Sequence, residues 1–175
     1  MTTTKGLLEL DARLSERLRG TEKNKSLRRI WVLLAHSGDS WFWILGLGVL
    51  WFFGSDYWRE RALALLIGIL VTAILVMALK FSVRRSRPVG EWGNIYRSTD
   101  PHSFPSGHAA RATMLAGMML GLGPVWLGAL LILWAPFVSL ARVSMGVHFL
   151  LDVFAGMIIG ILIAVGLLFL QLIFF

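Results

Sequence analysis

The chain has 175 residues, a length that suggests one domain, and 57% of these residues are hydrophobic. It carries a formal net charge of +7 and contains no cysteine, which excludes disulfides and a cysteine-based metal site. Several runs approach the ~20 apolar residues that cross a bilayer, so the composition excludes an ordinary soluble domain. The predicted fold is an all-α, polytopic integral membrane helical bundle.

The basic residues are concentrated in two places. Of the 17 Lys and Arg residues, eight fall in the first thirty positions and five lie between positions 80 and 97. Basic residues beside membrane spans usually set orientation and bind anionic lipid. Because the chain offers no soluble basic domain, we expect a lipid bilayer as its partner and no nucleic acid.

Residues 1–38 form the first predicted unit, an N-terminal helical segment. Leu7, Leu8, Leu10, Leu14 and Leu18 fall at helical spacing, with charged residues between them. This pattern predicts an amphipathic helix at the membrane surface, and a helix packed on the protein's own membrane domain fits it equally well. A second short helix is expected to end before the polar residues 36–40.

Residues 39–175 form the predicted membrane domain, with about five transmembrane helices. We expect spans over 40–53, 61–81, 106–121, 125–140 and 148–175, the last long enough to cross with tilt. Residues 82–104 are the one long polar connection of this domain, and such loops are often functional. Alternation of the spans places this connection, the N-terminal segment and residues 141–148 on one side of the membrane.

The first candidate cluster on that side is basic. It comprises Lys80, Arg84, Arg85 and Arg87, which is followed by Pro88. On a continuous helix Lys80, Arg84 and Arg87 would share a face, and Arg is suited to gripping phosphate oxygens. The alternative is a set of positive anchors at a helix end.

The second cluster is Pro105-Ser106-Gly107-His108, which has the features of a helix N-terminus. Free backbone N–H groups and the helix dipole favour an anion there, and Gly107 allows close approach. His108 would then lie beside the anion and could protonate a leaving group. The alternative is a simple capped turn.

The third cluster holds the only formal charges after Arg111, namely Arg142 and Asp152, together with His148. Ionisable groups within an apolar run usually mark a functional site. The spacing of four places Asp152 beside His148, where it would fix the imidazole tautomer and leave the other nitrogen nucleophilic. A buried structural pair is the alternative. Because the clusters are strongly cationic, we expect an anion and no metal ion.

The three clusters together resemble the signature of the type 2 phosphatidic acid phosphatase superfamily of lipid phosphatases, which shares its fold and site with vanadium haloperoxidases. The resemblance rests on Lys80 six residues before Arg87-Pro88, on residues 105–108, and on the Arg142, His148 and Asp152 spacing. It implies a phosphohistidine at His148, oriented by Asp152, with His108 as acid and base. Lys80, Arg87, Ser106, Gly107 and Arg142 would hold the phosphate, without metal or other cofactor.

Two features depart from that family's pattern. Ala141 occupies the place of a serine that usually precedes the arginine of the third motif. Many bacterial members have six spans, and this chain is expected to lack the first. Its eight N-terminal basic residues therefore lie on the side of the site, and the positive-inside rule predicts a cytoplasmic site. Six-span members commonly face outward, so the two arguments conflict.

The predicted function is hydrolysis of a lipid phosphomonoester or diphosphate by a cell-membrane enzyme. Phosphatidylglycerol phosphate, phosphatidic acid and polyprenyl phosphates or diphosphates are all compatible substrates. The alternative is a non-catalytic component that binds or transports a lipid phosphate. Such a protein needs the cations but not the His148–Asp152 pair.

Overall fold

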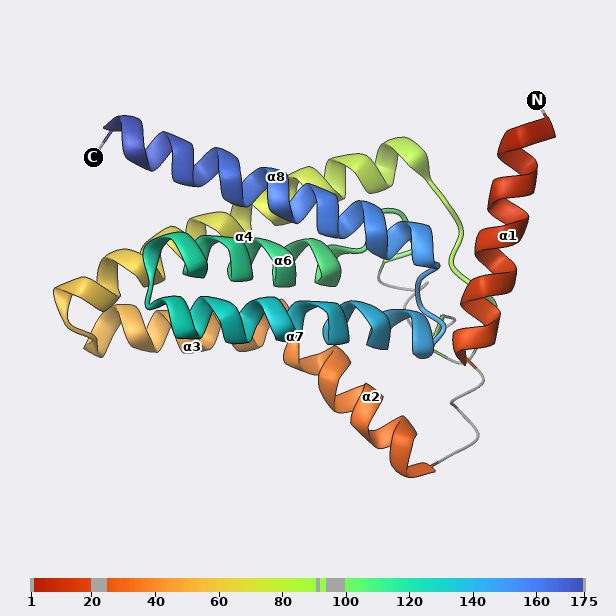
Figure 1. Ribbon diagram of the computed structural model, residues 1–175, viewed down its shortest axis with the longest axis horizontal. Helices are drawn as coiled ribbons and strands as arrows, with labels where there is room; N and C mark the ends of the chain where they lie inside the picture. Colours follow the sequence, from red (N-terminus) through yellow and green to blue (C-terminus); the bar gives the residue numbers. More distant parts are fainter. Residues whose placement is uncertain (1, 20–24, 91, 94–99, 175) are drawn as a thin grey trace.

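The computed structural model of the chain describes residues 2–19, 25–90, 92–93 and 100–174. Within these ranges the chain is helical apart from short turns and extended segments, so the all-α prediction is confirmed (Figure 1). The helices with described bounds are α1 (Thr2–Arg19), α2 (Lys25–Ser37), α3 (Ser40–Phe53), α4 (Asp56–Val83), α6 (Gly107–Leu122), α7 (Val125–Ser144) and α8 (Leu150–Phe174).

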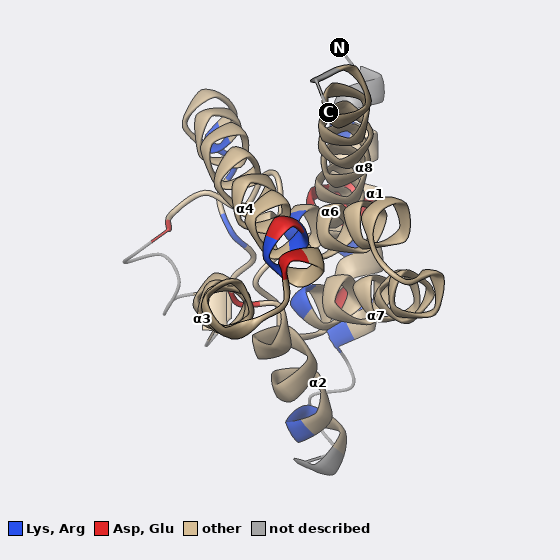
Figure 2. Cartoon of the chain, turned by 90° about the vertical axis from the view of Figure 1, so that its left-hand side faces the viewer, with Lys and Arg blue, Asp and Glu red and all other residues tan. Residues whose placement is uncertain are grey.

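Helices α3, α4, α6, α7 and α8 run along the long axis of the molecule (Figure 1). The α3–α4 and α6–α7 turns and the C-terminus lie at one end, and the α7–α8 turn lies at the other end with α1 and α2 (Figure 1). Viewed along the bundle, α6 lies among α4, α7 and α8 (Figure 2), and it contacts all three. The end of α4, the start of α6 and the α7–α8 turn therefore lie at the same end of the bundle.

Small residues allow α6 and α8 to approach closely. Gly156 and Gly160 of α8 face the backbone of α6, and a Cβ at Gly160 would meet the carbonyl oxygen of Ala110 and the nitrogen of Met114. In membranes, where lipid is as apolar as leucine, this small-residue spacing is a common means of helix association. The close contact fixes the start of α8 beside the start of α6.

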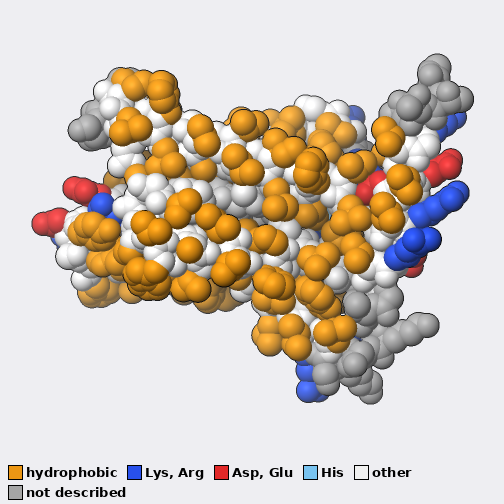
Figure 3. Space-filling view, viewed as in Figure 1, with side chains coloured by type: hydrophobic (Ala, Val, Ile, Leu, Met, Phe, Trp, Pro, Cys, Tyr) orange, Lys and Arg blue, Asp and Glu red, His pale blue; other side chains and the backbone are white. Residues whose placement is uncertain are grey.

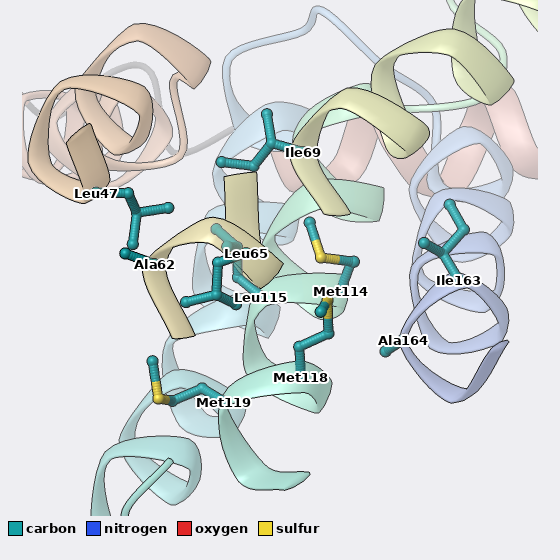
Figure 4. Close-up of a cluster of buried hydrophobic side chains, with 10 residues drawn as sticks. All are labelled: Leu47, Ala62, Leu65, Ile69, Met114, Leu115, Met118, Met119, Ile163 and Ala164. Atoms are coloured by element: carbon teal, nitrogen blue, oxygen red, sulfur yellow. The ribbon is translucent and has the colours of Figure 1, made fainter. Parts of the chain in front are cut away.

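The largest cluster of buried apolar side chains lies in the half of the bundle away from α1 and α2. Figure 4 shows these side chains, contributed by α3, α4, α6 and α8: Leu47, Ala62, Leu65, Ile69, Met114, Leu115, Met118, Met119, Ile163 and Ala164. Flexible methionines fill the irregular space between the helices. The buried charged residues lie in the opposite half.

Hydrophobic side chains cover the face of the bundle seen in Figure 3, and charged residues lie at its two ends. Three helices in the described ranges are long and apolar enough to cross a membrane: Asp56–Val83, Val125–Ser144 and Leu150–Ile173. Helix α3 is apolar but shorter. The outer surface of the molecule is that of a membrane-embedded bundle.

Helix α1 packs against α7 and α8 at the end of the bundle. Its buried residues are polar: Asp11 is 4% exposed and Ser15 is 3% exposed. Leu7, Leu8 and Leu10 are exposed. Helix α1 therefore lies against the other helices of the bundle, and contact of its leucines with the membrane surface stays a prediction.

Candidate active site

The basic cluster after α4 is divided by the end of the helix. Arg84 ends α4 in the left-handed conformation, with φ 53° and ψ 36°. Its exposed guanidinium donates to the carbonyl of Phe81 at 2.9 Å. The prediction that Lys80, Arg84 and Arg87 share a helix face is therefore wrong, because α4 stops before Arg84.

The segment that follows Arg84 is extended and pairs with the segment before α6. Ser86 forms an antiparallel bridge with His102, and the N–H of Ser103 donates to the carbonyl of Arg85 at 2.8 Å. The hydroxyl of Ser103 donates to the carbonyl of Ser86 at 3.1 Å. This pairing joins the first candidate cluster to the second.

Lys80 and Arg87 meet at the carboxylate of Asp100. Lys80 Nζ forms an ion pair with Asp100 Oδ2, and Arg87 Nη2 donates to the same oxygen at 2.7 Å. Lys80 also donates to the carbonyl of His102 at 3.1 Å, and Arg87 Nη1 to the carbonyl of Val147 at 2.9 Å. Both cations are buried, and the carboxylate of Asp100 holds them in place within the pocket.

His148 lies between a cation and a carboxylate. Its Nε2 is 3.3 Å from Arg87 Nη1, and its Nδ1 is 3.6 Å from Asp152 Oδ2. Asp152 Oδ2 also accepts from the N–H of Phe149 at 2.9 Å. Burial lowers the pKa of His148 to about 4, and the Arg87 and Arg142 charges act in the same direction. The imidazole is therefore neutral near pH 7.

Ser106 and His108 stand at the start of α6. The Ser106 hydroxyl is 3.5 Å from the N–H of Ala109, in the position of an N-cap, and the N–H of Ser106 donates to the carbonyl of Asp152 at 2.9 Å. The predicted helix N-terminus is confirmed. Ser106 thus ties the second cluster to the third.

Asp39, in the turn before α3, joins two histidines and was missed by the sequence analysis. Its Oδ1 is 2.7 Å from His108 Nε2, and its Oδ2 is 2.9 Å from His36 Nδ1. Burial opposes ionisation of Asp39, but the hydrogen bonds and charges of His108 and His36 outweigh it and hold the pKa of Asp39 well below its usual value. Arg111 holds this turn by donating to the carbonyl of Gly38. The feature of the sequence that could have identified Asp39 is the polar stretch 36–40, which directly precedes an apolar helix.

Six of the eight predicted site residues line one pocket of about 510 Å³: Lys80, Arg87, Gly107, His108, Arg142 and His148. Asp39 and Asp100 line it too, and Trp41, Val76 and Met77 add apolar walls. Ser106 and Asp152 are completely buried and lie outside this lining. The pocket has the composition of an anion site with an apolar flank.

Ala141 belongs to a separate apolar cluster. It is fully buried together with Ala35, Met145 and Val147, and Trp31 packs against them. A serine hydroxyl at this position would face apolar side chains of α2 and would need its own hydrogen-bond partner. The packing of α2 thus accounts for alanine where the family usually has serine.

An apolar helical bundle with a pocket of buried cations and two histidines at one end defines the chain as a helical membrane protein with a polar pocket. The sequence pattern of the PAP2 superfamily matches residues 61–173, so the chain belongs to that superfamily. The structure likewise identifies an integral membrane protein with helical spans.

Two curated proteins are similar in sequence. The undecaprenyl-diphosphatase of Sulfolobus acidocaldarius is 32% identical over 77% of this chain and 66% of its own length. The putative undecaprenyl-diphosphatase YbjG of Escherichia coli is 28% identical over 65% of this chain and 59% of its own length. The chain therefore spans slightly under two thirds of the length of each curated relative.

Two crystal structures share the fold. The PAP2-type phosphatidylglycerolphosphate phosphatase from Bacillus subtilis superposes with a TM-score of 0.80 at 23% identity, covering 99% of this chain and 90% of that one. LpxE of Aquifex aeolicus superposes with a TM-score of 0.71 at 28% identity, covering 92% and 93%. Helices α1 and α2 lie within the range shared with the first structure.

Proposed function

We propose that this protein is a metal-independent phosphatase of a membrane lipid monophosphate or diphosphate. In this proposal His148 attacks phosphorus, and a bond from Nε2 to phosphorus forms as the bond to the leaving oxygen breaks. His108 gives its proton to that oxygen. It then takes a proton from the water that hydrolyses the phosphohistidine, releasing inorganic phosphate.

The observation that carries the proposal is the setting of His148. A guanidinium can only donate, so the contact from Arg87 requires the lone pair on His148 Nε2. Nδ1 then holds the proton and faces Asp152. This is the tautomer required for attack by Nε2, and a phosphate in the same pocket would find Lys80, Arg87 and Arg142 around it.

The carboxylate of Asp100 supports an anion at this position. It accepts from Lys80 and Arg87, and carboxylate and phosphate oxygens use the same guanidinium geometry. A phosphoryl group of higher charge would compete with it there. Its position supports the proposal that phosphate oxygens bind to the same donors.

The apolar wall of the pocket supports a lipid as the substrate. Trp41 of α3 and Val76 and Met77 of α4 line the same pocket as the two histidines. Met77 is 48% exposed on the outside of the bundle, so the wall continues onto the lipid-facing surface. An acyl or prenyl chain could lie between α3 and α4 while its phosphate reaches His148.

We also propose that α3 and α6 cross the membrane, giving five spans. Helix α4 ends at the site and α7 begins at the opposite end, so α6 must return across the bilayer if both of them span it. Helix α3 has 14 residues and is about 21 Å long, short of the ~30 Å apolar core, and the preceding helix would extend its reach.

The proposed orientation places the site in the cytoplasm. Helices α1 and α2 lie at the site end of the bundle, and the first thirty residues carry eight Lys or Arg residues. The opposite turn carries Arg59 and Arg61. Basic residues favour the cytoplasmic side.

The names of the relatives suggest two substrate classes. Two curated relatives are a diphosphatase of a polyprenyl lipid and a putative one, and one similar structure is a phosphatase of a phosphoglycerolipid. Both classes present a terminal phosphate on an apolar chain, which fits the pocket. A cytoplasmic site favours early phospholipid intermediates, and an outward site favours polyprenyl diphosphate.

The test is phosphate release by purified protein in detergent, ranked by kcat/KM over short-chain phosphatidic acid, phosphatidylglycerol phosphate and a polyprenyl diphosphate. His148→Ala is expected to lower kcat by at least about 1,000-fold, as removal of a covalent nucleophile does in other hydrolases. His108→Ala should accumulate a phosphohistidine when the leaving group is good and needs no protonation.

His102→Ala is the matched control, because this histidine packs its ring against Phe81 and does not line the pocket. It should retain activity within about threefold. Full activity of His148→Ala would overturn the mechanism. Binding of lipid phosphate without release by the wild type would favour the non-catalytic alternative.

A further inference from the structure

Helix α1 presents its polar residues to the protein. Asp11 and Ser15, one helical turn apart, are buried, whereas Leu7, Leu8 and Leu10 are exposed. A helix held only by hydrophobic packing would have the reverse arrangement. The contacts of Asp11 and Ser15 therefore decide how α1 is held.

Both residues accept hydrogen bonds from the first turn of α8. The N–H of Leu150 donates to Ser15 Oγ at 2.9 Å, and the N–H of Leu151 donates to Asp11 Oδ1 at 3.0 Å. The first N–H groups of a helix have no partner within that helix, and a negative charge there interacts favourably with the helix dipole. Helix α1 thus supplies the cap of α8.

Asp11 also reaches the site through a single guanidinium. Asp11 Oδ2 is 2.6 Å from Arg85 Nη2, and Arg85 Nη1 is 2.7 Å from Asp152 Oδ1. Arg85 is held over the ring of Phe149, 4.2 Å from its centroid. The other oxygen of Asp152 faces His148. The buried carboxylates of Asp11 and Asp152 thus share the guanidinium of Arg85, and the Asp152 carboxylate also faces the imidazole of His148.

We propose that Asp11 is a positioning residue of the active site, so that α1 completes the catalytic machinery. This inference rests on the proposed function, because it assigns Asp11 to the orientation of His148. Asp11 holds one arm of Arg85 away from Asp152. Without that partner, Arg85 could turn to grip both oxygens of Asp152 and draw Oδ2 away from His148.

The test is Asp11→Asn, which keeps the shape of the side chain and removes its charge. We expect kcat to fall about tenfold while KM stays within about twofold, because the phosphate contacts are untouched. In an Asp152→Asn background the same change should alter kcat by less than about twofold, since residues that act through one another are not additive.

Two controls separate positioning from stability. Glu9→Gln changes an exposed acid on the same helix and should leave kcat unchanged. Ser15→Ala removes the cap of Leu150 but not the link to Arg85, so it should lower the thermal midpoint in detergent more than kcat. Asp11→Glu should restore part of the kcat lost in Asp11→Asn, because it restores the charge.

Equal losses of kcat from Asp11→Asn in the wild-type and Asp152→Asn backgrounds would overturn the proposal, as would unchanged kcat in an active protein. A lowered thermal midpoint that fully accounts for the lost activity would also overturn it. If the wild type released no phosphate from any lipid, the proposed function and this inference would fail together. An active wild type with an unaffected Asp11→Asn variant would remove only the role of Asp11.

Discussion

Asp39, in the turn before α3, connects His36 of α2 with His108 of α6. Its two oxygens lie 2.7 Å from His108 and 2.9 Å from His36, so one carboxylate fixes two imidazoles. The carboxylate can accept the proton of His108 Nε2 and stabilise the charged imidazole that forms when His108 takes a proton from water. The carboxylate also holds the ring in one orientation at the edge of the pocket.

Asp39→Asn is therefore expected to lower kcat by about 10- to 100-fold, because a hydrogen bond to a charged group contributes about 1.5–3 kcal/mol. The measurement is steady-state phosphate release together with trapping of labelled phosphohistidine. Both formation and hydrolysis of this intermediate should slow, since His108 serves in both steps.

The matched control for Asp39 is Asp56→Asn, an exposed acid in the turn at the opposite end of the bundle. It should behave as the wild type. If Asp39→Asn were as active as Asp56→Asn, His108 would not depend on Asp39.

Most candidate residues of the site could be identified from the sequence, and so could the His148–Asp152 pair, but the other partners could not. Lys80, Arg87 and His148 stand out as ionisable groups beside apolar runs, and all three line the pocket. Asp100 lies in a polar loop, and the sequence does not distinguish it from the other polar residues of that loop as a partner of Lys80 and Arg87. Its contact with Lys80 and Arg87 depends on the path of that loop, which periodicity does not encode.

Arg85 is a second residue whose partner could not be predicted from the sequence. A helical continuation would group Arg84 with Lys80 and Arg87, but the left-handed residue at position 84 ends α4 and sends Arg85 toward Asp152. A left-handed arginine is uncommon, and nothing in the local sequence predicts it. For this reason the sequence did not predict that Asp11 of α1 is linked to Asp152 through Arg85.

At the scale of elements, the helix bounds follow the predicted spans closely. The expected spans over 40–53 and 125–140 correspond to Ser40–Phe53 and Val125–Ser144. Gly and Pro residues at the turns mark where hydrophobic runs stop, and this signal is local. The polar side of α1 that faces the protein cannot be predicted from the local sequence, because it depends on the position of the N-terminus of α8.

The contact between α6 and α8 carries a prediction about stability. A side chain at Gly160 would collide with the backbone of Ala110 and Met114, which cannot move away as a flexible side chain could. Gly160→Val should separate the helices and cost about 1–3 kcal/mol or more. It should also lower kcat, because Ser106 of α6 and Asp152 of α8 are hydrogen-bonded at the adjoining helix ends.

Gly166→Val is the matched control, since a Cβ at Gly166 on the same helix meets nothing within 4 Å. Thermal unfolding in detergent, followed by tryptophan fluorescence, compares the two variants. Equal midpoints for both would show that the packing of α6 on α8 tolerates separation and that Gly160 has no structural role.

At the scale of the whole molecule, the polar chemistry is confined to one end of an apolar bundle. The hydrophobic surface of Figure 3 fixes the bundle in the bilayer, but it does not distinguish the two sides. The distribution of basic residues does, because α1 and α2 bring seven Lys or Arg positions to the site end. Orientation in turn selects which leaflet supplies the substrate.

The orientation is tested with two single-cysteine variants, which the cysteine-free chain allows without background. Val89 is 77% exposed beside the site, and Ser55 is exposed at the opposite turn. In sealed cells a membrane-impermeant maleimide should label Ser55→Cys and spare Val89→Cys, and permeabilisation should expose both. The reverse pattern would place the site outside, where eight basic residues would have crossed the membrane against the usual bias. The substrate would then be drawn from lipid phosphates of the outer leaflet, and polyprenyl diphosphate would become the favoured class.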